Sequence, residues 1–254
     1  MLEINNLYAG YGKNVILQDV SVAIPDGKIT GIIGPNGCGK STLLKSVIGL
    51  ADIHSGELLV DGKAIHSFAP AERAREIAYL PQSKNVPDMT VEQMVLHGRF
   101  AYLDYPRRYG KKDVEIARRA MEKMELEAVC HVNLSRLSGG QRQKAYIDMA
   151  IAQEAPVILM DEPTTYLDIA HQLRLCDIMR ELAAMGKSVV AVLHDLPLAF
   201  SLCHSLYVMH KGSIAARGTP EEILAGDAVE RVFDIEMKKI NSGEKTHYVY
   251  SRSS

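Results

Sequence analysis

Hydrophobic and polar positions in the first sixty-odd residues follow the pattern of antiparallel strands. Short apolar runs that alternate or cluster like strands occupy 2–4, 20–24 and 58–60, and Asp61-Gly62 has the composition of a tight hairpin turn. This part of the chain therefore predicts an N-terminal antiparallel β subdomain.

The pattern changes to helical spacing after an apolar run at 77–80. Thr90 is followed three residues later by Gln93, which is the capping-box pattern that starts a helix. Apolar residues then recur at helical spacing across 112–125, which predicts an amphipathic helix. We therefore expect an inserted, mostly α-helical subdomain at about 83–155.

From residue 157 onward, apolar strands alternate with helical segments. The expected elements are buried strands at 157–160, 188–193 and 206–209 and helices at 169–185, 196–202 and 220–225. This alternation is typical of an α/β fold with a mainly parallel sheet flanked by helices. We expect one domain at 1–235 and a C-terminal extension at 236–254, in which 238–240 and 247–250 could pair as a β-hairpin.

The composition is that of a soluble globular protein with one large domain or two small ones. The 254 residues are 47% hydrophobic and 24% charged, and 29 basic minus 31 acidic residues give a net charge of −2. Because this balance provides no overall basic field, we expect no nucleic-acid partner. The four cysteines lack metal-ligand spacing and suggest no disulfide framework. We expect a cytosolic chain, since neither a signal-peptide pattern nor an apolar run long enough to span a bilayer is evident.

A glycine-rich segment between an apolar run and a helical pattern predicts a phosphate-binding loop. The run at 28–33 precedes it, the helical pattern at 41–48 follows it, and it reads Gly34-Pro35-Asn36-Gly37-Cys38-Gly39-Lys40-Ser41. Its glycines let backbone N–H groups point at phosphate oxygens, and the helix start adds the positive end of its dipole. We expect Lys40 to reach the β and γ phosphates and Ser41 to bind Mg²⁺, with a turn that binds nothing as the alternative. Cys38 is interpreted as a packing residue, with a reactive thiol as the alternative.

A second apolar strand carries two carboxylates at its C-terminal end. Asp161 and Glu162 follow the run at 157–160, and ligands gather at the carboxyl ends of strands in open α/β sheets. We expect Asp161 to hold Mg²⁺, directly or through water. Glu162 is then the candidate general base for the water that attacks the γ-phosphate. A solubilising pair of loop carboxylates is the alternative.

Two further polar residues follow strands and extend this candidate site. His194 ends the run at 188–193, where an imidazole can hydrogen-bond a γ-phosphate oxygen and orient water. Gln82 lies just past 77–80 and can bind Mg²⁺ or water through its side-chain carbonyl. A structural histidine and an ordinary loop glutamine are the alternatives. The predicted catalytic set is Glu162, His194, Lys40 and Gln82, and the predicted metal ligands are Ser41, Gln82 and Asp161.

An aromatic residue before the first core strands is the candidate for contact with adenine. Tyr11 lies between Gly10 and Gly12, which suggests a flexible loop whose ring could stack on the base. Tyr8 is its nearest rival, and a packed surface tyrosine is the alternative.

A second glycine-containing turn predicts another anion site at the start of a helix. It reads Leu137-Ser138-Gly139-Gly140-Gln141 and precedes a helical stretch at 142–153. One γ-phosphate cannot use both this turn and the phosphate loop if the two lie far apart in one chain. We therefore predict a head-to-tail pair in which the Ser138 turn of each copy caps the ATP of the other. A plain flexible linker is the alternative.

Taken together, these residues resemble the nucleotide-binding subunit of an ATP-binding cassette (ABC) transporter over about 2–225. The matching features are the adenine-stacking loop (Tyr11), Walker A (34–42, Thr42 included), the Q-loop (Gln82), the signature (137–141), Walker B with its catalytic Glu (157–162), the D-loop at the dimer contact (Leu167 and Asp168) and the switch histidine (His194). The resemblance implies a P-loop NTPase core that binds ATP and Mg²⁺ and hydrolyses ATP to drive transport.

The resemblance also implies partners and a location. These are a second copy of the chain in an ATP-dependent homodimer, two transmembrane permease subunits and, indirectly, an extracytoplasmic substrate-binding protein, at the cytoplasmic face of the cell membrane. The helical insertion matches the subdomain that docks on membrane partners. Apolar candidates for that contact are Met89, Val91, Met94, Phe100, Tyr102 and Leu103.

Smaller features resemble importers of iron–siderophore complexes, haem and cobalamin. They are the segments 163–172, 78–82 and 98–100, the last followed by a Tyr/Pro-rich loop at 102–109. The ATP pocket is the same whichever cargo is moved, so an exporter or an importer of another metal such as zinc or manganese stays open. Outside transport, a soluble cassette ATPase of translation or DNA repair and a scaffold for iron–sulfur assembly are the alternatives.

Overall fold

The computed structural model of the chain describes residues 1–82, 86–242 and 245–252. In this part the strands are β1 (Leu2–Tyr11), β2 (Asn14–Ile24), β3 (Ile29–Ile33), β4 (Asp52–Val60), β5 (Lys63–Ala64), β6 (Ile77–Leu80), β7 (Val157–Asp161), β8 (Ser188–Val192), β9 (Ser205–His210), β10 (Ser213–Gly218), β11 (Ile235–Ser242) and β12 (Lys245–Arg252). The α-helices are α1 (Lys40–Val47), α2 (Pro70–Glu76), α3 (Val91–His97), α4 (Lys111–Lys123), α5 (Gly139–Ala152), α6 (Ile169–Ala184), α7 (Leu196–Leu202), α8 (Pro220–Ala225) and α9 (Ala228–Phe233). Short 3₁₀ turns are η1 (Ile65–Ser67), η2 (Phe100–Tyr102), η3 (Glu127–Val129) and η4 (Leu134–Arg136).

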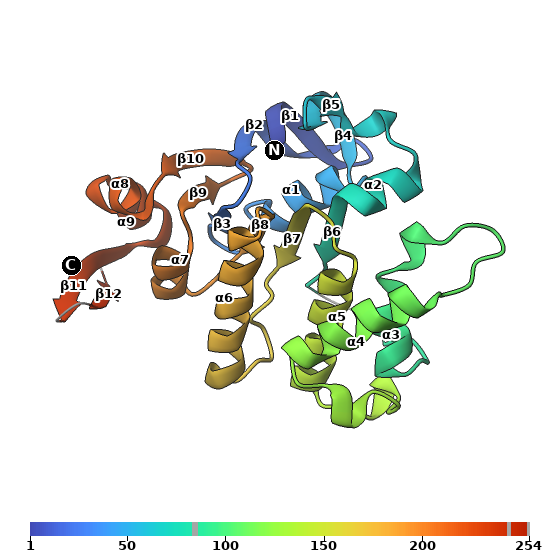
Figure 1. The fold of residues 1–254 in the computed structure, drawn as a ribbon. Coiled ribbons are helices and arrows are strands. Elements are labelled where there is room, and N and C mark those ends of the chain that lie inside the picture. Colours follow the sequence, from blue (N-terminus) through green and yellow to red (C-terminus); the bar gives the residue numbers. More distant parts are fainter. Residues whose placement is uncertain (83–85, 243–244, 253–254) are drawn as a thin grey trace.

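The N-terminal sheet is antiparallel, as the alternating pattern predicts. Its strand order is β2-β1-β4-β5, and it lies at the top of Figure 1. The prediction of a flexible loop around Tyr11 is wrong, because Tyr11 is the last residue of β1 and pairs with Asn14. Gly12 allows this tight turn, since it adopts a left-handed φ of 58°.

The central sheet confirms the predicted α/β fold with mainly parallel strands. Its order is β10-β9-β3-β8-β7-β6, in which only β10 runs antiparallel to its neighbour. Every residue of β3, β7 and β8 is buried. This explains why these strands are continuous apolar runs in the sequence, since helices cover both faces of a parallel sheet.

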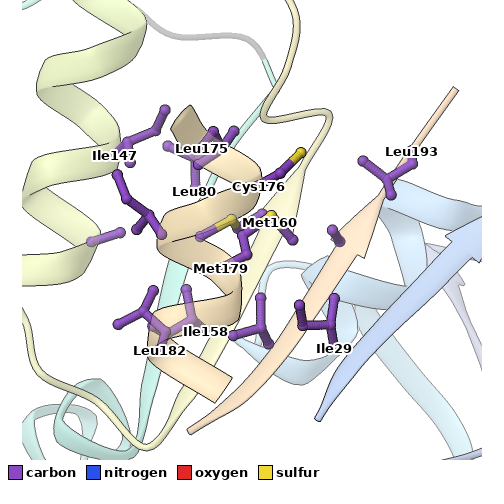
Figure 2. Packing of buried hydrophobic residues seen from close by; sticks show 14 of the residues in the cluster. Ile29, Leu80, Ile147, Ile158, Met160, Leu175, Cys176, Met179, Leu182 and Leu193 are labelled. Atoms are coloured by element: carbon purple, nitrogen blue, oxygen red, sulfur yellow. The ribbon is translucent and has the colours of Figure 1, made fainter. Parts of the chain in front are cut away.

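Helix α6 covers one face of the central sheet. Figure 2 shows Leu175, Met179 and Leu182 of α6 packed with Ile158 and Met160 of β7. Ile147 of α5 belongs to the same buried cluster. The helices between β6 and β7 therefore share one core with the sheet that carries the phosphate loop.

Between β6 and β7 the chain is largely helical, as expected. Helices α3, α4 and α5 pack on one another at the lower right of Figure 1. The sequence pattern did not reveal α2, in which none of the seven residues is buried. Without a buried face there is no apolar periodicity to find. The signature turn also differs from its prediction, because α5 begins at Gly139 rather than at 142.

The C-terminal extension forms the predicted hairpin. Strands β11 and β12 pair antiparallel, with Ile235 opposite Arg252. The ring of Tyr248 in β12 lies 5.3 Å from that of Phe200 in α7, measured between centroids. This contact fixes the hairpin on the helix that follows His194.

The four cysteines are free thiols. Cys38 is buried inside the phosphate loop, and this burial raises the pKa of its thiol. A raised pKa disfavours the reactive thiolate, which agrees with a packing role. In the described ranges no helix is long and apolar enough to cross a membrane.

Helix α5 buries a carboxyl group that has no partner. Asp148 is 0% exposed, and neither side-chain oxygen has a hydrogen-bond partner among the described residues. Burial raises the pKa of Asp148 well above its ordinary value of 3.8, while Lys144 opposes the shift and Glu127 adds to it. An unsatisfied buried polar group costs about 1–3 kcal/mol, so this side chain destabilises the helical region.

We expect Asp148→Ala to raise the thermal unfolding temperature, and to raise it more at pH 8 than at pH 5. Because the folded-state pKa of Asp148 is raised, the parent loses stability as pH rises from the unfolded-state pKa through the folded-state value. Asp148→Asn is the matched control, since it keeps a polar group but removes the ionisation and its pH dependence. Equal melting temperatures for parent and Asp148→Ala at pH 8 would contradict this account.

Candidate functional site

The phosphate loop is the bend between β3 and α1. Gly39 has a left-handed φ of 107°, and a methyl group built on it would lie 2.7 Å from Leu17 Cδ2. A methyl group on Gly34 would lie 2.4 Å from the carbonyl oxygen of Met209. Only glycine fits these two positions, because the loop passes so close to β2 and β9.

The side chain of Lys40 folds back over this loop. Its ammonium group donates to the carbonyl oxygens of Gly34 at 2.7 Å and Pro35 at 2.9 Å. Lys40 is only 5% exposed. Backbone carbonyl oxygens therefore hold the Lys40 ammonium group at the loop. A small movement of the side chain is enough to bring it to a bound phosphate oxygen.

A cavity of about 320 Å³ joins the phosphate loop to two other candidate segments. Its lining residues are Ile16, Asn36, Gly37, Gly39, Lys40, Ser41, Thr42, Gln82 and Glu162. Gln82 follows β6 and Glu162 follows β7, so the carboxyl ends of neighbouring strands meet the loop here, as open α/β sheets predict.

Asp161 lies beside Ser41 at the inner end of this region. Ser41 Oγ donates to Asp161 Oδ1 at 3.0 Å, and the Tyr79 hydroxyl approaches Asp161 Oδ2 at 3.4 Å. Burial raises the pKa of Asp161, and the hydrogen bond from Ser41 opposes that shift. A hydroxyl and a carboxylate together suit Mg²⁺, which takes one or two carboxylates and leaves its other positions to phosphates and water. Sequence reasoning missed Tyr79, although its place on the strand next to β7 was a usable signal.

Glu162 and His194 meet at the ends of β7 and β8. His194 Nε2 lies 2.6 Å from Glu162 Oε1. Glu162 has a left-handed φ of 52°, which turns the chain sharply after Asp161 and separates the directions of the two carboxylates. The structure thus brings together the two residues that sequence reasoning assigned to the attacking water.

Tyr11 lies near the site but does not line the 320 Å³ cavity. Its ring is 42% exposed at the end of β1. Burial is the main cause that raises the pKa of Tyr79, and the charges of Asp161 and Tyr11 add to the shift.

The signature turn lies apart from the phosphate loop of its own chain. None of 137–141 lines the cavity at Lys40. Ser138 caps α5, with its hydroxyl accepting from Gln141 N at 3.2 Å while the Gln141 side chain accepts from Ser138 N at 3.1 Å. Leu137 is buried, whereas Gly139 and Gly140 form the half-buried first turn of the helix.

The two residues of the predicted D-loop differ in exposure. Leu167 is buried in the hydrophobic core. Asp168 is exposed and caps α6, accepting from His171 N at 2.9 Å. This bond and the His171 side chain lower the pKa of Asp168. Of the pair, only Asp168 offers its side chain to a second molecule.

Comparison with known proteins places this arrangement among transport ATPases. The family model described as "ABC transporter" matches residues 17–165. The chain is 43% identical over 231 residues to the "Probable siderophore transport system ATP-binding protein YusV" of Bacillus subtilis (strain 168), covering 90% of this chain and 84% of that protein. It is 41% identical to the ferric enterobactin transport ATP-binding protein FepC of Escherichia coli (strain K12), covering 90% and 85%. It is 38% identical to the cobalamin import ATP-binding protein BtuD of Halobacterium salinarum, covering 92% and 58%.

Solved structures of ABC transporters and their ATP-binding cassettes also superimpose on this chain. One, described as a metal-chelate type ABC transporter in an inward-facing conformation, superimposes with a TM-score of 0.82 and 27% identity over 98% of this chain and 97% of that chain. A dimeric post-hydrolysis state of the cassette MJ0796 bound to ADP and Pi gives a TM-score of 0.77 and 27% identity over 87% and 99%.

Proposed function

The chain belongs to the ABC transporter family, and we propose that it hydrolyses ATP to power an importer of iron–siderophore complexes or cobalamin. ATP-binding subunits of this family are ATPases coupled to transport. The observation that carries the proposal is the Glu162–His194 pair beside a phosphate-loop cavity, in a chain 43% identical to a siderophore transport ATP-binding protein.

In the proposed chemistry, the candidate residues in and around the cavity have separate roles. The 34–42 loop and Lys40 bind the phosphates of ATP, and Tyr11 stacks on its adenine. Ser41, Asp161 and Gln82 would hold Mg²⁺, which neutralises phosphate charge. Glu162 accepts a proton from the attacking water, and His194 orients that water against the γ-phosphate.

Two copies of the chain are needed to complete each site in this proposal. The signature turn lies outside the cavity at Lys40, so its capped helix start is free to meet the ATP of a partner. Dimeric cassette structures among the similar proteins support such a pair. Asp168 is the D-loop side chain exposed for the contact.

We propose that a groove of about 380 Å³ receives a permease segment at the cytoplasmic face of the membrane. The groove runs between α2, the end of α3 and η2, and its lining residues are Pro70, Ala71, Ala74, Arg75, His97, Gly98, Phe100, Ala101, Leu103, Arg107 and Gln153. None of these is a carboxylate, and the Arg107 guanidinium lies 4.4 Å from the Phe100 ring centroid. The groove therefore suits a short permease helix with apolar side chains and an acidic one.

The groove also separates the apolar residues named as candidates for the permease contact into those that line it and those that are buried elsewhere. Phe100 and Leu103 line it. Val91 and Met94 are buried in the core, so they are not available to a partner. Tyr102 is half-buried under Arg99, and Met89 packs partly against the core.

We expect Arg107→Glu to reduce co-purification with the permease subunits by at least about tenfold, because a reversed charge costs several kcal/mol against an acidic partner. Arg231→Glu, a reversal on the exposed face of α9, should have no effect. Equal recovery of permease with both variants would exclude the groove as the contact.

Cargo is tested by uptake of radiolabelled ferric siderophore, haem and cobalamin into cells that lack the gene and are complemented with it. We expect uptake of one of these chelates to depend on the chain and on Glu162. The chelate assignment would be wrong if uptake of none of these three chelates depended on the chain. It would also be wrong if the chain were needed only for uptake of a free metal ion such as zinc.

A further inference from the structure

The segment 103–112, between η2 and α4, concentrates positive charge on a chain whose net charge is −2. Its basic residues are Arg107, Arg108, Lys111 and Lys112. Asp104 is the only carboxylate of the segment, and every residue from 104 to 112 is exposed. In Figure 1 the segment is the green loop that projects at the right of the helical region. We call 103–112 the basic loop.

The four cations of the basic loop are not neutralised by neighbouring carboxylates. Within the described residues none of them forms an ion pair. Further along α4 the situation is different, because Arg118 pairs with both Glu115 and Glu122. The charge of the basic loop is therefore available to an anionic partner outside the chain.

Two of these charges lie where they do not stabilise the fold. Lys111 and Lys112 are the first two residues of α4, and the positive end of a helix dipole disfavours cations. Asp113 in the same turn is already engaged, since it accepts from the Gly110 N–H at 2.9 Å and from Arg99 Nε at 3.3 Å. The folding of α4 therefore does not account for the two lysines.

The basic loop is anchored at its base beside the proposed permease groove. Arg99 pairs with Asp113 after the loop, and its guanidinium lies 4.0 Å from the ring centroid of Tyr102 before it. The Arg107 guanidinium lies 4.4 Å from the ring centroid of Phe100, and both of these residues line the groove. The loop is thus a continuation of one wall of the groove.

The loop also carries an aromatic residue that is almost fully exposed. Tyr105 is 96% exposed, and it does not line the groove. Tyrosine favours the boundary between water and lipid headgroups, and lysine and arginine bind anionic headgroups. Arg108, Lys111 and Lys112 also lie outside the groove. A projecting loop with these side chains fits a flat anionic surface better than it fits a peptide, which needs a groove.

We propose that the basic loop contacts anionic lipid headgroups of the membrane beside the permease. This inference rests on the proposed function, in which the neighbouring groove receives a permease segment at the membrane face. Arg108, Lys111 and Lys112 bind headgroup phosphates, and the ring of Tyr105 lies among the headgroups. The contact keeps the groove turned toward the membrane while the permease segment binds.

The test is co-sedimentation of the purified full-length chain with vesicles of equal parts phosphatidylglycerol and phosphatidylcholine. The parent should bind these vesicles but not phosphatidylcholine alone, and added salt should weaken the binding. The triple variant Arg108→Gln/Lys111→Gln/Lys112→Gln should bind about a hundredfold more weakly, because each cation near an anionic surface contributes roughly fivefold.

A matched variant separates the position of the charges from their number. Arg118→Gln/Arg119→Gln/Lys123→Gln removes three cations from the later turns of α4, where each has a carboxylate partner. This control should bind anionic vesicles as the parent does. The loop variant should melt no lower than the parent, since removal of two lysines from the helix start relieves their repulsion by the dipole.

Fluorescence gives a second readout, because the chain contains no tryptophan. Tyr105→Trp therefore introduces a single reporter at the end of the loop. Its emission should shift to shorter wavelength with anionic vesicles, as the indole enters the headgroup region. Tyr250→Trp, at a position 58% exposed in β12, should show no shift.

The inference would be overturned if the parent did not bind anionic vesicles, or if the loop variant and the α4 control bound them equally. If vesicles were not bound but the loop variant lost co-purification with the permease subunits, the loop would instead be a protein contact. Failure of the proposed function looks different, because vesicle binding requires neither ATP nor permease. It would persist while Arg107→Glu left the recovery of permease unchanged.

Discussion

Glu162→Gln is expected to lower the ATP turnover number by about 10²–10⁴-fold while leaving ATP binding intact. Glu162 reaches the cavity at Lys40 and lies 2.6 Å from His194 Nε2. The amide keeps the size of the side chain and an oxygen that can accept from His194, but it cannot take a proton from water. The loss should therefore appear in kcat, with little change in the ATP concentration at half-saturation.

The same variant should accumulate as an ATP-bound pair of chains. If hydrolysis is what separates the copies, removal of the base stops the cycle in the closed state. Size-exclusion chromatography with ATP should show a dimer for Glu162→Gln and a monomer after ATP is washed out. Glu57→Gln, the same charge change on the exposed face of β4, serves as the control. Near-normal turnover in Glu162→Gln would remove Glu162 from the role of base.

The sequence predicted the elements with a strong apolar signal and the residues at their ends. Strands β3, β7 and β8 are fully buried, so their apolar runs are unmistakable. Asp161, Glu162 and His194 follow such runs directly, and parallel pairing of β7 with β8 brings their ends together. Chemistry at strand ends is therefore accessible to reasoning from the sequence alone.

Elements held by few buried residues were not predictable. Helix α2 buries none of its residues, yet it forms one wall of the proposed permease groove. Tyr11 was placed on a loop because two glycines flank it, although β1 extends to it through backbone pairing with Asn14. Pairing of this kind depends on a partner strand and leaves no local signal.

Contacts between distant segments were equally hidden. The bond from Gln143 to Pro163 O joins residues twenty positions apart, and the sequence shows only a glutamine on a helix. Likewise, Asp148 looks like a polar residue on a solvated face, but the structure buries it completely. Its position contradicts local preference, since a carboxylate is rarely buried without a partner.

Lys40→Ala is expected to weaken ATP binding by about 30-fold to several thousand-fold. The ammonium group of Lys40 is buried at the loop and would pair with phosphate oxygens, and loss of one partner from a buried charge pair costs about 2–5 kcal/mol. Fluorescent ATP analogues measure this affinity directly. The affinity for ATP should fall even when no hydrolysis takes place, because the charge of Lys40 contacts the phosphates of bound ATP before any reaction occurs.

Interpretation of Lys40→Ala depends on keeping the loop folded, because Lys40 also donates to the carbonyl oxygens of Gly34 and Pro35. Lys40→Met keeps the length of the side chain without its charge, so both variants should lose affinity if the charge is responsible. Lys63→Ala, on the exposed strand β5, should bind ATP as the parent does. If Lys40→Met bound ATP with unchanged affinity, the cation would not contact phosphate. The phosphates would then be bound only by the N–H groups of the glycine loop and by the dipole of α1. The partial charge at the start of a helix is small, so it competes poorly with water for a phosphate.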